Sequence, residues 1–252
     1  MMHSKYILGT LVLVFLIGCF EPPAFPLEPE ISFNRMEFVD VEGAADSLVL
    51  TFDFQDGDGD IGLSSSDYLP PFHSFDLVFD SNGEPVFYND TAFTLPLYSI
   101  YDSTQRELPV YEFSGELPEY SCRDYTSGYE YVINGDTIFS RQDTLLIDQN
   151  EFNKNIYLEF LRKRGADYVS INNEFSRGSC DEFFNSRIPV FDEDNMGRAI
   201  SGSISFAMLS QGFKATFRND SIKVRFYIFD RGLNKSNVAE SPDFVLRDIT
   251  RN

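Results

Sequence analysis

The chain has 252 residues, with 40 acidic and 20 basic side chains and a formal net charge of −20 at pH 7. A surface of this sign repels nucleic acid and anionic lipid head groups, so nucleic acid is excluded as a partner. The hydrophobic share of 42%, with 26 Phe and 13 Tyr, is ample for a packed core.

The first 18 residues have the features of an export signal. Lys5 supplies the positive start, and an apolar run follows from residue 7 to residue 17. This run is shorter than the ~20 residues that a membrane-spanning helix needs. It ends in Leu-Ile-Gly-Cys at residues 16–19, which resembles the lipobox of bacterial lipoproteins. The resemblance implies cleavage before Cys19 and a lipid on Cys19. The alternative is an ordinary secretory signal in which Cys19 has no role.

Residues 19–30 predict a short tether between the lipid and the folded body. The prolines in it are Pro22, Pro23, Pro26 and Pro29. Proline favours an extended chain without backbone hydrogen bonds. The lipobox resemblance therefore implies a protein anchored to the outer membrane through its lipid, on the periplasmic or the surface-exposed face.

The folded body, residues 31–250, contains many short runs of β-branched and aromatic residues separated by turn residues. The runs expected as strands are 31–41, 47–54, 74–79, 85–88, 129–133, 137–139, 156–161, 168–171, 200–208, 222–229 and 244–246. Glycine-containing turns at 81–83, 134–136 and 164–166 predict three hairpins. The pattern predicts an all-β fold, an immunoglobulin-like or fibronectin-like β-sandwich, with a long insertion at about residues 64–190.

The strand-like run at 47–54 leads into an acidic glycine loop. Asp56, Asp58 and Asp60 alternate with two glycines, which let the backbone curl so that three carboxylates point inward. Calcium takes six to eight oxygen ligands, so such a loop favours a calcium site. The alternative is an acidic turn in solvent, because Asp and Gly are also ordinary turn residues.

The spacing of these acids resembles the calcium loop of EF-hand and dockerin-type proteins. Asp56, Asp58 and Asp60 match its first, third and fifth positions, and Asp67 matches its twelfth. The sixth position, normally Gly, is Ile61, and the flanking runs are not helical. The sequence therefore predicts a related metal loop and not an EF-hand. The further candidate ligands are Asp53, Asp67 and Asp230.

A second informative stretch covers residues 224–246. A strand, the polar turn Asp-Arg-Gly-Leu-Asn-Lys-Ser-Asn at 230–237, and a closing strand resemble the last hairpin of immunoglobulin-like and fibronectin-like domains. If this turn lies at the same end of the sandwich as the acidic loop, Asp230 or Asn234 approaches the metal. The alternative is a plain turn in which Asp230 pairs with Arg231 or a lysine.

Two cysteines remain once Cys19 carries a lipid. In an exported protein, Cys122 and Cys180 are expected to form one disulfide, worth about 4 kcal/mol in the chain-entropy model. The alternative is two separate buried thiols.

The combination of these features resembles uncharacterised lipoproteins of the Bacteroidota. The segments that carry the resemblance are the lipobox at 16–19, the Asp-Gly-Asp-Gly-Asp-Ile-Gly turn at 56–62, and the turn at 230–237. The resemblance implies a place in the cell envelope and assigns no activity.

Signatures of catalysis are scarce in this sequence. His73 is the one histidine after the signal, and Gly-x-Ser-x-Gly, HExxH and Gly-x-x-x-x-Gly-Lys motifs are absent. We therefore expect a non-catalytic binding or scaffold subunit of an envelope complex, with calcium as a structural ion. A glycan-binding or adhesion lipoprotein that uses Tyr98, Tyr101 and Tyr111 is an alternative, and a carbohydrate-active hydrolase is another, because two carboxylates suffice for glycoside hydrolysis.

Overall fold

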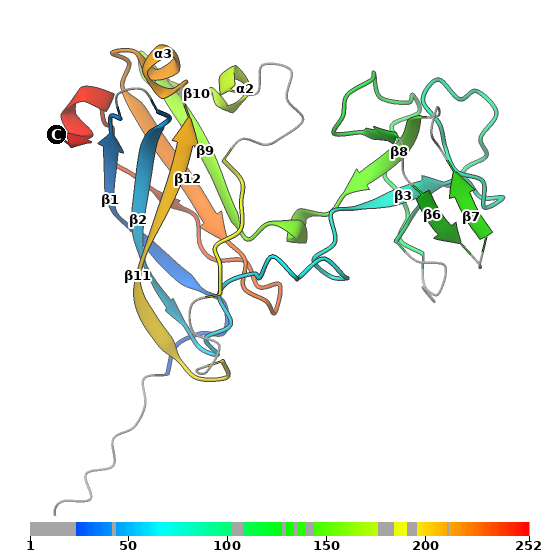
Figure 1. Ribbon diagram of the computed structural model, residues 1–252, viewed down its shortest axis with the longest axis horizontal. Helices are drawn as coiled ribbons and strands as arrows, with labels where there is room; N and C mark the ends of the chain where they lie inside the picture. The colour runs from blue at the N-terminus through cyan, green and yellow to red at the C-terminus, as the bar shows by residue number, and fades with distance from the viewer. Residues whose placement is uncertain are drawn as a thin grey trace, which may run out of the picture.

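The computed structural model describes residues 24–41, 44–101, 108–127, 130–133, 136–139, 144–175, 184–190, 196–210 and 212–251, and it is built mostly of β-strands (Figure 1). The strands of its larger part are β1 (Glu30–Val39), β2 (Asp46–Asp56), β9 (Ile156–Arg164), β10 (Asp167–Ser170), β11 (Ile200–Ser210), β12 (Ile222–Ile228), β13 (Ala239–Glu240) and β14 (Thr250–Arg251). Short helices, α2 (Asn172–Phe175) and α3 (Phe213–Phe217), join some of these strands.

The first sheet has the strand order β11-β2-β1-β14, and β2 is a central strand. Its two neighbours in the sheet, β1 and β11, both run antiparallel to it. Leu48, Leu50, Phe52 and Phe54 are buried on one face of β2, at every second position. This alternation is what a strand with one face on a core requires.

The second sheet has the order β10-β9-β12-β13, and it packs against the first through a shared core. β9 and β12 pair antiparallel from Ile156 opposite Ile228 to Arg162 opposite Ile222. The rings of Phe52 in the first sheet and Phe226 in the second have centroids 5.3 Å apart. The predicted all-β sandwich is confirmed, and the immunoglobulin-like topology stays a prediction.

A smaller part of the chain lies beside the sandwich and has cores of its own (Figure 1). Its strands are β3 (Phe75–Phe79), β4 (Tyr98–Ile100), β5 (Tyr125–Ser127), β6 (Glu130–Ile133), β7 (Asp136–Phe139) and β8 (Thr144–Gln149). They form a four-stranded sheet, β4-β3-β8-β5, and a β6–β7 hairpin. Two connecting segments, 64–74 and 150–155, run between this part and the sandwich (Figure 1).

The inserted part is therefore shorter than the predicted range of 64–190. β9 and β10 lie within that range, yet they pair with each other and with β12 in the second sheet of the sandwich. β9 belongs to the sandwich because its side chains Leu158 and Phe160 are buried in the main core.

Two of the three predicted hairpins are present in the structure, and the first is not complete. The hairpin at 164–166 is confirmed as β9–β10, and β6–β7 confirms the second, although residues 134 and 135 lie outside the described part. The first hairpin is reduced to β3 and an isolated bridge between Phe79 and Pro85.

The expected strand at 244–246 is absent from the described structure. Phe244 makes an isolated bridge to Ile222, and a 3₁₀ helix begins at Leu246. β13 instead pairs with β12 at the edge of the second sheet.

Candidate metal centre

Four aspartates from two separate segments meet at the ends of β2 and β12. Asp56 is the last residue of β2, Asp58 and Asp60 follow it in the loop, and Asp230 lies two residues after β12. Each contributes a carboxylate oxygen to a group whose members all lie within 4.8 Å of one another. β2 and β12 belong to different sheets, so the cluster joins the two layers of the sandwich.

The loop after β2 curls in the way that its glycines allow. Gly59 has a φ of 67°, which favours a residue without a side chain. The backbone N–H of Asp60 donates to Oδ2 of Asp56 over 3.0 Å, which closes the turn and brings these two carboxylates together. The backbone N–H of Gly197 donates to the carbonyl of Asp58 over 2.5 Å and holds the middle of the loop.

The turn after β12 positions Asp230 through Asn234. The Asn234 backbone N–H donates to Oδ1 of Asp230 over 2.7 Å, and its side-chain amide donates to Oδ2 over 2.9 Å. The N–H of Arg231 donates to the carbonyl of Asp60 over 3.2 Å, which ties the two loops to each other. Asn234 therefore orients the carboxylate of Asp230. The sequence had predicted only that Asp230 or Asn234 approaches the metal.

Three carboxylates of this cluster each have one buried oxygen without a hydrogen-bond donor in the described structure. Asp56 is 0% exposed and Asp230 is 2% exposed. The Oδ1 atoms of Asp56, Asp58 and Asp60 have essentially no exposed surface and meet no hydrogen-bond donor among the described residues. A turn with its carboxylates in solvent, the alternative that the sequence allowed, does not match this burial. Burial of charge without a partner is strongly unfavourable, so the group fits a cation.

The electrostatics of the cluster follow from its burial and crowding. Burial raises the pKa of Asp56 to about 7, and repulsion from Asp58 and Asp60 adds to the shift. Burial raises the pKa of Asp60 to about 6, with further repulsion from Asp230 and Asp58. The pKa of Asp230 is also raised, again chiefly by burial. These carboxyl groups keep their protons to a higher pH because the protein places too little positive charge beside them.

The donor set determines which ions suit the cluster. All four side chains offer oxygen, the ligand that Ca²⁺ and Mg²⁺ prefer, and none offers the nitrogen or sulfur that favours zinc. The four aspartates could therefore hold a metal ion of the hard, oxygen-binding class.

Asp53 is not part of the cluster, although the sequence offered it as a ligand. It accepts hydrogen bonds from the Asn34 amide at 3.1 Å and from the Ser203 hydroxyl, on the solvent side of the first sheet. The hydrogen bond from Ser203, and then that from Asn34, lowers the pKa of Asp53. Strand alternation is the reason, because Asp53 faces away from the side on which Phe52 and Phe54 are buried.

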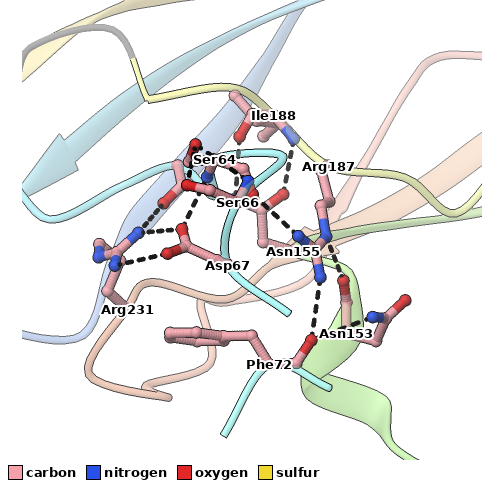
Figure 2. A network of polar contacts seen from close by, with 10 residues as sticks. Ser64, Ser66, Asp67, Phe72, Asn153, Asn155, Arg187, Ile188 and Arg231 are labelled. Carbon is pink, nitrogen blue, oxygen red and sulfur yellow. Dashed lines mark hydrogen bonds and ion pairs between the residues drawn. The ribbon is translucent and has the colours of Figure 1, made fainter. Parts of the chain in front are cut away.

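Asp67 is also outside the cluster, so the twelfth position of the calcium-loop pattern is not fulfilled. It forms an ion pair with Arg231, with Nη1 and Oδ2 2.6 Å apart, and accepts the backbone N–H of Ser64 over 2.7 Å (Figure 2). The hydrogen bond from Arg231 is the main reason that the pKa of Asp67 is lowered. Arg231 was a predicted partner of Asp230, and it pairs with Asp67 instead.

Arg187 is a half-buried residue that holds three backbone carbonyls, and no sequence pattern had pointed to it. Its guanidinium donates to the carbonyls of Asn153, Ser64 and Phe72 over 2.6, 2.9 and 2.9 Å (Figure 2). Asn155 holds the next residue by accepting the N–H of Ile188 over 2.6 Å. No motif marks Arg187, because its partners are backbone carbonyls that are distant in sequence.

The remaining predicted residues lie apart from the metal centre. Tyr111 packs against the core of the smaller part, and Tyr101 lies against His73 with ring centroids 4.3 Å apart. His73 Nε2 is 2.7 Å from Oδ1 of Asp76. Tyr98, the third predicted tyrosine, is in β4.

The cysteine predictions rest partly on residues outside the described structure. Cys122 lies in the smaller part of the chain, whereas Cys19 and Cys180 are outside the described residues. Lipidation of Cys19 and a Cys122–Cys180 disulfide therefore stay predictions.

Comparison with known proteins returns no relative. No family model, no curated protein and no solved structure matches the chain. Among the described residues, no helix combines the length and apolar character needed to cross a bilayer. The class that the fold and the site define is an all-β sandwich protein with a four-aspartate cluster that could hold a metal ion.

Proposed function

We propose that this protein is a lipid-anchored, non-catalytic binding or scaffold subunit of a cell-envelope complex, and that calcium bound by Asp56, Asp58, Asp60 and Asp230 stabilises it. The observation that carries the metal part is the convergence of four carboxylates, three of which have a buried oxygen without a hydrogen-bond donor in the described structure.

Calcium fits this cluster better than magnesium does. Ca²⁺ accepts six to eight oxygens in a flexible arrangement, and each aspartate supplies one or two. Mg²⁺ keeps several water molecules and is usually held by one or two carboxylates. Four aspartates on two loops therefore suit the larger ion.

The ion would act as a cross-link between the two sheets. Asp56 ends β2 of the first sheet, and Asp230 follows β12 of the second. An ion shared by both is lost when the sheets separate, so its binding free energy adds to the stability of the folded state.

Membrane attachment and a non-catalytic role are supported by the sequence alone. The lipobox-like end of the export signal supports the anchor, and the lack of catalytic motifs supports a non-catalytic role.

The test is thermal unfolding of the protein with Asp58→Asn, in excess calcium and in chelator. At calcium of about 10–100 times Kd, we expect the ion to add roughly 1.4–2.7 kcal/mol, and its loss to lower Tm by about 3–10 °C. In chelator the variant should match the wild type or exceed it, because it removes one charge from a repulsive cluster.

Asp53→Asn is the matched control, since Asp53 lies nearby on β2 outside the cluster. Its effect on Tm should be the same with and without calcium. Equal losses of Tm for Asp58→Asn in both conditions, or no effect of calcium on the wild type, would overturn the metal assignment.

A further inference from the structure

The free edge of β11 differs from every other edge of the sandwich. β11 pairs with β2 without a register shift over 11 residues, from Ile200 opposite Asp56 to Ser210 opposite Asp46. It ends the first sheet, so its other side has no strand partner in the described structure. The strand contains neither a charged residue nor a proline, in a chain of net charge −20.

The other edges carry the protections that natural sheets use. β13 and β14 have two residues each, and β10 has four. Charges also cover the second sheet's edges, because Glu240 on β13 pairs with Lys223 and Arg225, and Asp167 lies on β10. Short and charged edges discourage strand addition, whereas a long uncharged edge invites it.

Three apolar side chains on the core face of β11 are incompletely covered, whereas Met208 on that face is buried. Ile200, Ile204 and Phe206 pack against the main core but remain partly exposed, in contrast to Phe52 on β2, which is 0% exposed. Leu209 on the opposite face is 66% exposed. A strand added beyond β11 would cover these apolar groups and use the unpaired backbone groups of the edge.

We propose that β11 is a pairing surface for β11 of a second copy of this chain, in antiparallel orientation about a two-fold axis at Ser205. Two such strands extend the four-stranded sheets into one continuous sheet. This inference does not depend on calcium binding, and it adds self-association to the proposed scaffold role.

A second copy of β11 matches this edge in side-chain size and in its lack of charge. With the axis at Ser205, Ile204 faces Phe206 of the other copy on the core side, and Gly202 faces Met208. Large side chains then meet across the axis, and the smallest residue is opposite a long flexible one. An acidic partner strand would bury charge against apolar groups, whereas an uncharged copy of β11 adds none. Isologous two-fold contacts are also the commonest way in which identical chains associate.

The test is oxidative cross-linking of the full chain that carries Ser205→Cys, analysed on a non-reducing gel. Antiparallel neighbours at a two-fold axis bring their Cα atoms to about 4.5–5.5 Å, within the reach of a disulfide. We expect a reducible dimer band well above that of the wild type, which sets the background of the native cysteines. Ser170→Cys on exposed β10 is the matched control, and it should not exceed this background.

A second variant asks whether the edge itself drives the association. Ala207→Lys, placed in the Ser205→Cys chain, puts a charge on each copy at an exposed position of β11. We expect roughly tenfold less cross-linked dimer, because charged edges resist pairing. Ala207→Ser should leave the yield unchanged. The proposal is overturned if Ser205→Cys gives no dimer above background, if Ser170→Cys gives as much, if Ala207→Lys has no effect, or if the cross-link forms to a different protein.

Discussion

Asp53 and Asp56 lie three residues apart on the same strand and have opposite surroundings. Asp53 faces solvent and accepts hydrogen bonds from Asn34 and Ser203, so its pKa is lowered. Asp56 is buried beside Asp58 and Asp60, so its pKa is raised to about 7. Asp53 is close to Asp56 in sequence but is not a metal-ligand candidate, because residues an odd number of positions apart on a strand point to opposite faces.

The raised pKa values predict how the metal-free protein responds to pH. In the unfolded chain these carboxyls titrate near 3.8, whereas in the folded protein Asp56 titrates at about 7 and Asp60 at about 6. The folded state therefore binds more protons between pH 4 and 7, and stability falls as pH rises through that window.

Urea unfolding of metal-depleted protein at pH 5 and pH 8 measures this effect. The wild type should be less stable at pH 8, and Asp56→Asn should reduce that difference because it removes the titrating group. In excess calcium the wild type should gain stability toward pH 8, since the ion binds the deprotonated carboxylates. Metal-free protein that is equally stable at both values would contradict the assignment of buried, crowded carboxylates.

At the scale of elements, the tether leads into the body beside the candidate metal centre. An ideal Cβ on Gly57 would lie 2.6 Å from the carbonyl oxygens of Phe25 and Pro26, so the tether touches the acidic loop. Ile31, at the start of β1, exchanges two hydrogen bonds with the Asn237 side chain, over 2.7 and 2.9 Å. The tether, the acidic loop and the 230–237 turn therefore form one end of the sandwich.

The anchor at the start of this tether is tested by Cys19→Ser in the full chain. We expect loss of metabolic labelling by a radioactive fatty acid and release of the protein from the membrane fraction, because one thiol carries the lipid. Cys122→Ser, which changes a cysteine of the smaller part in the same way, should keep both label and membrane association. Persistent labelling of Cys19→Ser would exclude the lipobox reading.

The boundary of the inserted part depends on which sheet contains β9, and the sequence pattern did not determine that. β9 reads as one of several aromatic strands between residues 64 and 190. Its partner β12 begins about 60 residues later, and this pairing places β9 in the sandwich. Hydrophobic alternation predicts that a strand exists and which face is buried, but it does not choose the sheet.

For the whole molecule, Arg231 links the acidic loop to the junction with the smaller part, and Arg187 holds that junction. Arg231 donates its backbone N–H to Asp60 and pairs through its side chain with Asp67 in the connecting segment. Arg187 holds carbonyls of both connecting segments, at Phe72 and at Asn153. The two guanidinium groups thus join the sandwich to the connections that carry the smaller part (Figure 2).

This arrangement predicts that Arg187→Lys loosens the junction. One ammonium cannot serve three carbonyls in the fixed geometry of a guanidinium, and loss of two charged hydrogen bonds costs roughly 3–6 kcal/mol. Chymotrypsin should cut faster after Tyr68 and Phe72 in the variant, as read from the masses of the fragments. Arg35→Lys is the control, because Arg35 makes an exposed pair with Glu37. Unchanged cleavage in Arg187→Lys would show that the network does not hold the segment.

The sequence by itself determined most of the strands, two of the three hairpins, and the loop that supplies Asp56, Asp58 and Asp60. These features are local, since they depend on alternation, glycine content and turn chemistry over a few residues. Only the tertiary structure decided that Asp230 joins the cluster, that Asp67 does not, and that Arg187 organises the junction. Those outcomes depend on which segments pack together, and packing between chain segments more than 100 residues apart leaves no local signature.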